Sequence, residues 1–115
     1  MQRITTGNAI TDAKKCWFVG SFFGPELGLR KSDDVEVKWG IHKAGEERAD
    51  WVTGEARTTL GILISGKWEM IFRDKTVVLS KPGDFVLWEK GVDHKWQAKA
   101  DTTIMTIRWP SIKQY

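Results

Sequence analysis

The sequence is poor in the residues that disulfides, metal sites and nucleophilic catalysis use. Its 115 residues include one cysteine, two histidines and one tyrosine. The lone Cys16 excludes an internal disulfide and favours a reducing compartment, so we expect a cytoplasmic protein. No run approaches the ~18 consecutive apolar residues of a membrane span, and residues 1–15 lack the apolar segment of a secretory signal. We therefore expect no membrane partner.

The chain also lacks a concentrated stripe of positive charge. Its formal net charge is +3, but lysine and arginine alternate with acidic residues along most of its length. The only tight basic pairs are Lys14-Lys15 and Arg30-Lys31. Nucleic-acid surfaces need clustered cations that follow the phosphates, so we expect no nucleic-acid partner. Phosphate-loop, dinucleotide and zinc-finger patterns are absent as well.

What the chain does have is a composition typical of one globular domain, with 41% hydrophobic and 29% charged residues. Seven tryptophans are many for this length. A Trp ring supplies a large flat surface to a core, a pocket or an interface. Because exposed sheet edges need covering, we expect a homodimer.

Short alternating runs separated by turns predict an all-β domain from Val35 onward. In the first run, apolar residues from Val35 to Ile41 alternate with polar ones and glycine, which predicts a half-buried strand over 35–42. His42 falls on the polar side of this run, so we expect it to contact solvent. Further strands are expected over 58–64, 68–72, 76–79, 85–88, 94–97 and 102–109.

The remaining segments give weaker signals. The polar, glycine-containing stretch 43–54 is expected to form a loop. Residues 1–34 are expected to form an N-terminal extension that packs on a barrel made of residues 35–115, within one domain overall. In that extension, Asn8 to Lys15 could form a short helix or cross a barrel end. Segments 17–19 and 22–23 suit a strand or core packing.

One stretch resembles the second sequence motif of the cupin superfamily. Gly83, Gly91 and His94 have the spacing of that motif, while Glu89 replaces its proline and Ala98 its asparagine. Glycines at these positions permit two tight reversals, and the strand between them carries the histidine toward a barrel interior. The resemblance implies a small cupin of the double-stranded β-helix, or jelly-roll, type.

The first cupin motif is present only in degraded form. Counting back from Gly66 places Thr59 at the position of a ligating glutamate, and Thr53 and Glu55, or Trp51 and Thr53, at the paired histidines. A transition metal needs three or four N, O or S donors. We therefore expect no metal or other cofactor, although Glu46, Glu47 or Asp50 could complete an atypical ligand set.

The same alignment identifies candidate site residues. His94 and Trp96 share strand parity and are expected to line the pocket. His94 is either a general acid or base, with Glu55 as its possible partner, or a structural histidine bonded to a neighbour. The expected ligand-binding set is His94, Trp96, Thr53, Glu55, Arg57 and Thr59.

Three functions remain open on this evidence. The first is a cupin that binds a small organic ligand in its barrel without a metal. The second is a metal-independent isomerase or lyase that uses His94. The third is a metal-dependent cupin enzyme with an atypical ligand set. Cys16 has no second cysteine as a partner in the sequence and gives no argument for nucleophilic catalysis.

Overall fold

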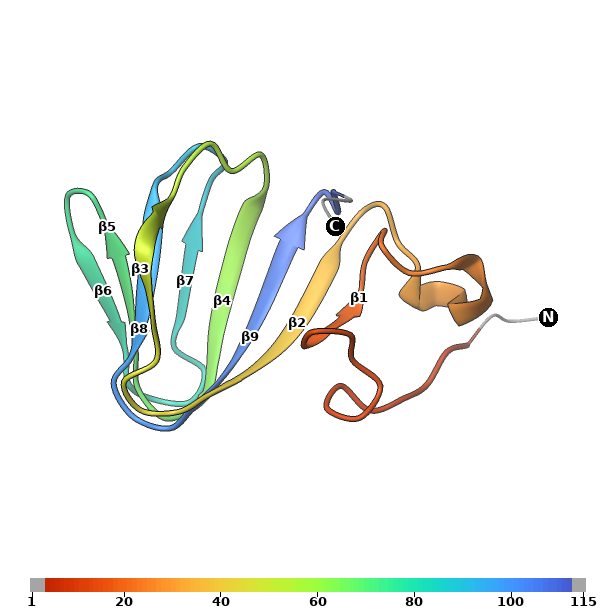
Figure 1. The fold of residues 1–115 in the computed structure, drawn as a ribbon, viewed down its shortest axis with the longest axis horizontal. Helices are drawn as coiled ribbons and strands as arrows, with labels where there is room; N and C mark the ends of the chain where they lie inside the picture. The colour runs from red at the N-terminus through yellow and green to blue at the C-terminus, as the bar shows by residue number, and fades with distance from the viewer. Residues whose placement is uncertain (1–3, 113–115) are drawn as a thin grey trace.

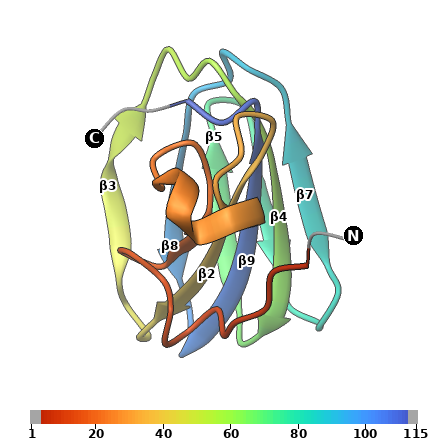
Figure 2. The same ribbon diagram turned by 90° about the vertical axis from the view of Figure 1, so that its right-hand side faces the viewer.

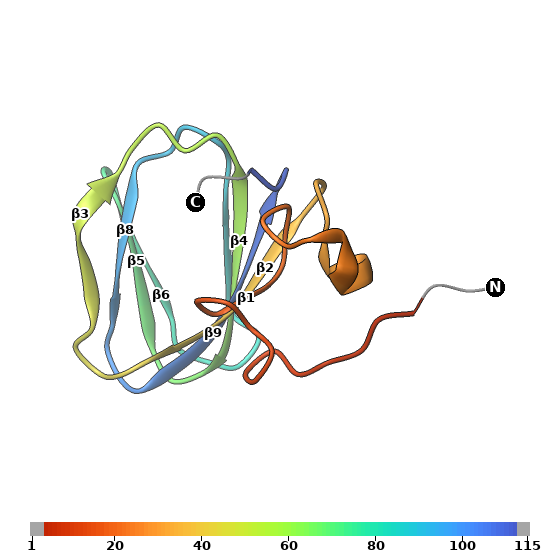
Figure 3. The same cartoon turned by 45° about the vertical axis from the view of Figure 1, so that its right-hand side comes forward.

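The computed structural model describes residues 4–112, which fold into two antiparallel sheets that face each other (Figure 1). The first sheet has the strand order β1-β2-β9-β4-β7 and the second the order β3-β8-β5-β6. The strands are β1 (Trp17–Val19), β2 (Glu36–His42), β3 (Glu47–Val52), β4 (Thr58–Ser65), β5 (Trp68–Phe72), β6 (Thr76–Leu79), β7 (Phe85–Trp88), β8 (His94–Ala98) and β9 (Thr102–Trp109). Figure 3 shows the two sheets opposite each other, with β3, β8, β5 and β6 on one side and β4, β9 and β2 on the other.

The strands expected after Val35 are confirmed, and their turns follow the local chemistry. Pro82 and Gly83 form a tight turn in which the Asp84 amide donates to the Lys81 carbonyl over 2.9 Å. Gly83 has φ of +93° and Gly91 has φ of +85°, a region that glycine enters without steric cost. The two motif glycines therefore bracket β7, and Gly91 lies in the turn that leads from β7 to His94 at the start of β8.

One strand was missed in the sequence. The stretch expected to be a loop contains β3, which lies at the edge of its sheet and pairs with β8. Most of its residues are exposed, and its register with β8 shifts between Arg48 and Val52. A polar, irregular edge strand shows no apolar alternation, which explains why the periodicity did not predict it.

The N-terminal region adds a strand to the first sheet. β1 pairs with β2, and the 3-10 helix η1 (Pro25–Arg30) follows it. Figure 2 shows this region beside the barrel. No helix forms over 8–15, where turns lead instead to a short bridge between Lys14 and Trp17. Neither η1 nor the absence of that helix was evident from the sequence.

The polar face of β2 points into the barrel, although its apolar alternation predicted that the apolar face would be buried. Glu36 and Gly40 are buried inside the barrel, while Ile41 is exposed. His42 therefore points inward, with only 13% of its side chain exposed, and the expectation that it contacts solvent was wrong. The alternation located the strand correctly but did not show which face lay inside.

The barrel interior has an apolar part and a polar part. The apolar part is a cluster of buried residues: Leu63, Trp68, Met70, Leu79, Val86, Trp88, Ala98 and Ile104. Three of its members, Trp68, Met70 and Ile104, also line a pocket that occupies the polar part. The core therefore positions one wall of this pocket. Over residues 4–112, none of the helices has the length and apolar character needed to cross a membrane.

Candidate functional site in the barrel

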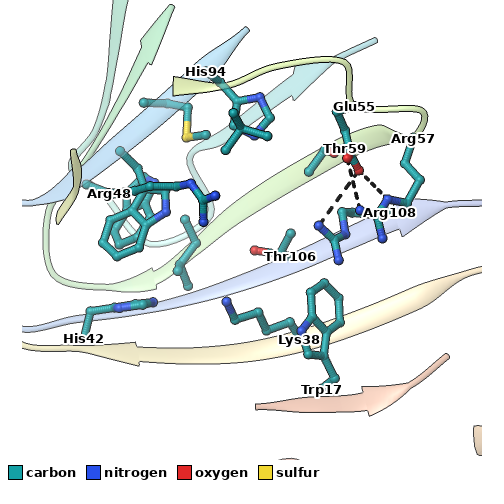
Figure 4. Close-up of a pocket in the computed structure, with 15 residues that line it drawn as sticks. Trp17, Lys38, His42, Arg48, Glu55, Arg57, Thr59, His94, Thr106 and Arg108 are labelled. Atoms are coloured by element: carbon teal, nitrogen blue, oxygen red, sulfur yellow. Dashed lines mark hydrogen bonds and ion pairs between the residues drawn. The ribbon is translucent and has the colours of Figure 1, made fainter. Parts of the chain in front are cut away.

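A pocket of about 340 Å³ lies between the two sheets (Figure 4). Its volume falls at the small end of the ~300–1,000 Å³ range of ligand pockets. The strands β2, β4 and β9 of the first sheet and β3, β5 and β8 of the second supply most of its wall. The lining residues are Trp17, Lys38, His42, Arg48, Val52, Glu55, Arg57, Thr59, Trp68, Met70, His94, Trp96, Ile104, Thr106 and Arg108.

Five of the six residues expected to bind a ligand line this pocket. They are Glu55, Arg57, Thr59, His94 and Trp96. The sixth, Thr53, is exposed and does not line it. The five side chains that strand parity placed on one side of the sheet therefore do line one pocket, while their roles toward a ligand stay predictions.

An aromatic wall forms one side of the pocket. The Trp68 and Trp96 rings are stacked, with centroids 4.5 Å apart and planes at 21°. The His42 ring lies 5.0 Å from Trp68 and 4.7 Å from Trp96. These three rings are fixed by β5, β8 and β2, so the wall is rigid on three strands and offers aromatic surface to a ligand.

A charged cluster forms the opposite side. Glu36, which is 0% exposed, accepts hydrogen bonds from Arg57 Nη1 at 2.7 Å and from Arg108 Nη2 at 2.8 Å. Arg57 also pairs with Glu55 through its Nε. Arg108 lies over the Trp17 ring, 4.2 Å from the ring centroid. The cluster joins β1, β2, β4 and β9 at one end of the barrel.

Several members of this site were not predicted from the sequence. Glu36 and Lys38 lie on the polar side of the 35–42 run together with His42, the side that was expected to face solvent. One feature of the sequence could have predicted them. A strand with Glu, Lys and His on one face can form the wall of a polar pocket as well as a solvent-exposed surface. Apolar alternation alone does not distinguish that case from a solvated face.

His94 is oriented by its own backbone. Its Nδ1 lies 3.0 Å from the Val92 carbonyl oxygen, and because a carbonyl only accepts, Nδ1 donates and Nε2 is left as an acceptor. Burial lowers the pKa of His94, outweighing the hydrogen bond to Val92 and the charge of Glu55, which raise it. The imidazole is therefore neutral near pH 7.

The predicted partner of His94 is engaged elsewhere. Burial opposes ionisation of Glu55, but its hydrogen bonds to Arg57 and the charges of Arg57 and Arg108 outweigh this and hold its pKa below the usual range. Within residues 4–112, no hydrogen bond joins Glu55 to His94. The carboxylate acts on the imidazole only through the electric field, as an ionised group.

Solved structures of known proteins share this architecture. A cupin-2 domain protein from Shewanella frigidimarina has 27% sequence identity and a TM-score of 0.55, covering 65% of this chain and 70% of its own. A cupin superfamily protein from Desulfitobacterium hafniense has 21% identity and a TM-score of 0.63, covering 70% of this chain and 72% of its own. The chain has the cupin fold.

Other cupin-fold neighbours differ more in sequence. The protein KdgF from a Halomonas species is 18% identical with a TM-score of 0.62, covering 70% of this chain and 74% of its own. At that identity the likeness shows the fold alone. The sequence matches no protein-family model and no curated protein.

The donors in this cupin barrel do not suit a bound metal ion. The cupin resemblance places Thr59 and His94 at ligand positions, and Thr53 and Glu55, or Trp51 and Thr53, at the paired histidines. Of the residues in these two alternatives, Glu55 lines the pocket, and it is already paired with Arg57. Across residues 4–112 no group of three His, Cys, Asp or Glu side chains is arranged to hold a metal. Arg57 and Arg108 also bring positive charge to the place where a cation would bind. Cation binding here would meet repulsion and too few ligands.

Proposed function

We propose that this cupin-fold protein binds a small organic molecule in its barrel pocket, without coordinating it through a metal. The observation that carries the proposal is the pocket itself, which has a rigid aromatic wall on one side and fixed charged groups on the other. Binding sites combine apolar surface with a few convergent polar groups that set orientation. A barrel filled solidly by side chains would offer no such site.

An isomerase or lyase activity has less support in the geometry. A neutral His94 with Nε2 as acceptor suits a general base. An acid and base pair would need a second proton-transferring group in contact with it, and the predicted one, Glu55, is bound to Arg57 instead. Binding needs no such partner, so it is the function that the arrangement supports best.

The test is a fluorescence and thermal-shift screen of the purified protein against a metabolite panel. A ligand stacked on Trp96 should change the tryptophan emission in a saturable way and raise the melting temperature, because a ligand at 100 times its Kd stabilises the fold by about 2.7 kcal/mol. Affinity should be the same with and without EDTA.

A matched pair of variants locates the response. Trp96→Phe should reduce the emission change, whereas Trp51→Phe should leave it unchanged, because Trp51 does not line the pocket. A panel without any ligand would contradict the proposal. Loss of binding in EDTA would contradict the metal-independent part alone.

We also propose that the protein forms a homodimer through the outer face of its five-stranded sheet. Two adjacent cross-strand rows on that face are entirely apolar: Val37, Ile107, Leu60 and Leu87 in one, and Trp39, Met105, Ile62 and Phe85 in the other. Phe85 is 64% exposed and Leu87 is 54% exposed. Broad apolar patches of this kind mark protein interfaces.

A second copy of the chain is the partner that fits this face. The two rows, which cross four strands, contain no charged group that would select a different partner by charge. Four strands about 4.8 Å apart and two rows that each take about 7 Å along the strands give an apolar footprint of roughly 270 Å². This patch would form the apolar centre of an interface, and the residues around it would supply the rest of the ~800 Å² per partner in a standard interface. Two such flat faces can pack about 10 Å apart around a twofold axis.

A further inference from the structure

The pocket holds more positive than negative groups. The cations that line it are Lys38, Arg48, Arg57 and Arg108. Against these four stand two carboxylates, Glu55 in the lining and Glu36 directly behind it. Two positive charges are therefore in excess where a ligand would lie.

The two carboxylates are both committed to the same two arginines. Arg57 binds Glu36 and Glu55, and Arg108 binds Glu36 and approaches Glu55 to 3.9 Å. These four side chains balance each other as a closed group at one end of the pocket. The excess charge consequently falls on the other two cations, Lys38 and Arg48.

Neither of these two cations has an acidic partner among residues 4–112. The Lys38 ammonium lies 5.6 Å from the centroid of the Trp17 ring. Within the described part of the chain, Arg48 forms no ion pair or hydrogen bond. Burial lowers the pKa of Lys38, and the nearby positive charges of Arg108 and Arg48 lower it further. The interaction with Cys16 raises the pKa but does not outweigh burial. A desolvated cation without a counterion is costly, and an anionic ligand would remove that cost.

A buried hydroxyl in the pocket wall is a second, independent observation that points to ligand binding. Thr59 is 2% exposed and lines the pocket, yet its Oγ1 makes no hydrogen bond within the described chain. Buried polar atoms are almost always bonded. Figure 4 shows Arg48, Lys38 and Arg108 approaching the middle of the pocket from different sides, with Thr59 deeper in the barrel wall.

We propose that the ligand is a small organic acid, whose carboxylate lies between Lys38 and Arg48 and whose body packs against the aromatic wall of His42, Trp68 and Trp96. Thr59 would give a hydrogen bond to a polar group at the buried end of the acid. The inference rests on the proposed function, because it names the chemical class of the molecule that the same pocket binds. It requires the pocket to prefer an acid to a neutral molecule of the same shape.

Calorimetric titration with matched probes tests this preference. The probes are benzoate against benzyl alcohol, and galacturonate against galactose, so that each pair differs mainly in the carboxylate. At least one acid should bind about tenfold or more tightly than its neutral counterpart, a difference of ~1.4 kcal/mol. Added salt should weaken the binding of the acid and leave the neutral compound unaffected.

Three variants connect the preference to the named residues. Lys38→Met and Arg48→Gln should each weaken acid binding about tenfold without changing neutral binding. Lys90→Met, which removes the same charge from an exposed turn outside the pocket, should change neither. Arg48 is exposed, so its variant tests the inference even if Lys38→Met does not fold.

The outcomes separate this inference from the proposed function. Equal binding of acid and neutral probes, or an uncharged ligand from the metabolite panel with no acid bound, would overturn the organic-acid assignment and leave ligand binding in place. If neither the four probes nor the panel gives a ligand, both proposals are wrong. Acid binding that survives Lys38→Met and Arg48→Gln would show that the carboxylate is held elsewhere.

Discussion

At the end of the barrel that holds the charged cluster, the two faces of the five-stranded sheet are the reverse of what a solvated β-sheet shows. The inner face carries a row formed by Glu36, Arg108, Thr59 and Trp88 across four strands. The neighbouring row on the outer face consists of Val37, Ile107, Leu60 and Leu87. Ordinarily the polar face of an antiparallel sheet meets water and the apolar face meets the core.

This inversion is informative because burying charge without a purpose is unfavourable. Ionised groups inside a barrel lower stability unless they pair with each other or with a ligand. Apolar residues left outside likewise lower solubility unless another surface covers them. The inner face therefore supports the proposed ligand binding and the outer face supports the proposed self-association, and each proposal can be tested separately.

The largest effect is expected on the inner face, from Glu36→Ala. The substitution leaves Arg57, 2% exposed, and Arg108 with one carboxylate fewer in a buried site, and it also removes the acceptor for the Ile112 amide. Breaking a buried charge network by removing one partner typically costs about 3–5 kcal/mol. Urea denaturation should show a loss of this size.

An exposed glutamate provides the control. Glu47→Ala on β3 removes the same charge from a solvent-facing position and should change the free energy of unfolding by less than about 0.5 kcal/mol. If Glu36→Ala costs no more than Glu47→Ala, the inner charged cluster does not stabilise the barrel, and the contrast between the two faces loses its energetic basis.

The next effect is expected on the outer face. The native protein should elute as a dimer, and Phe85→Lys with Leu87→Lys should convert it to a monomer, because four buried lysines would then oppose each other across the twofold axis. We expect the dissociation constant to rise about 30-fold or more, equivalent to ~2 kcal/mol. Light scattering after gel filtration measures the change.

Another exposed apolar residue provides a matched control on the other sheet. Val78→Lys on β6 introduces the same charge at an exposed valine away from the proposed interface and should leave the dimer intact. A native monomer would refute the dimer, and dissociation by Val78→Lys alone would move the interface to the four-stranded sheet.

How much the sequence could predict follows from what each signal measures. Alternation from Val35 onward located seven strands, β2 and β4 to β9, because alternation depends on local pairing alone. The Gly83 to His94 spacing predicted the cupin fold because turns need glycine at defined places. Which face of β2 points inward depends on residues far away in the chain, such as Arg57 and Arg108, and local pattern carries no such information.

The candidate site was predictable to the extent that parity could be anchored on a motif residue. Trp96 and Thr59 were placed correctly because their strands carry motif positions. Lys38 and His42 were not, because no motif position lies on β2. Arg48 lies on an edge strand that the sequence pattern did not indicate at all.

The smallest effect sharpens the contrast through pH. Burial lowers the pKa of both inward-facing histidines below 6.5. For His42 the charge of Lys38 lowers the pKa further, and the charge of Glu46 opposes this. For His94 the hydrogen bond to Val92 and the charge of Glu55 act in the opposite direction but do not outweigh burial. The unfolded chain then binds more protons than the folded one once the pH falls below ~6.5. Stability contributed by the neutral imidazoles should be present at pH 7 and should decline as the pH falls toward 5.

The chain has only two histidines, so a double variant isolates their contribution. His42→Gln with His94→Gln should flatten the dependence of melting temperature on pH between 7 and 5. Glu55, whose pKa lies below 4.5, contributes only at lower pH and does not interfere. If both imidazoles faced solvent, their pKa values would be the same in the folded and unfolded chain, and native and variant proteins would show the same profile. A flattened profile is the result expected of two imidazoles enclosed by the barrel, and His42→Gln alone then measures the share of the inward face of β2.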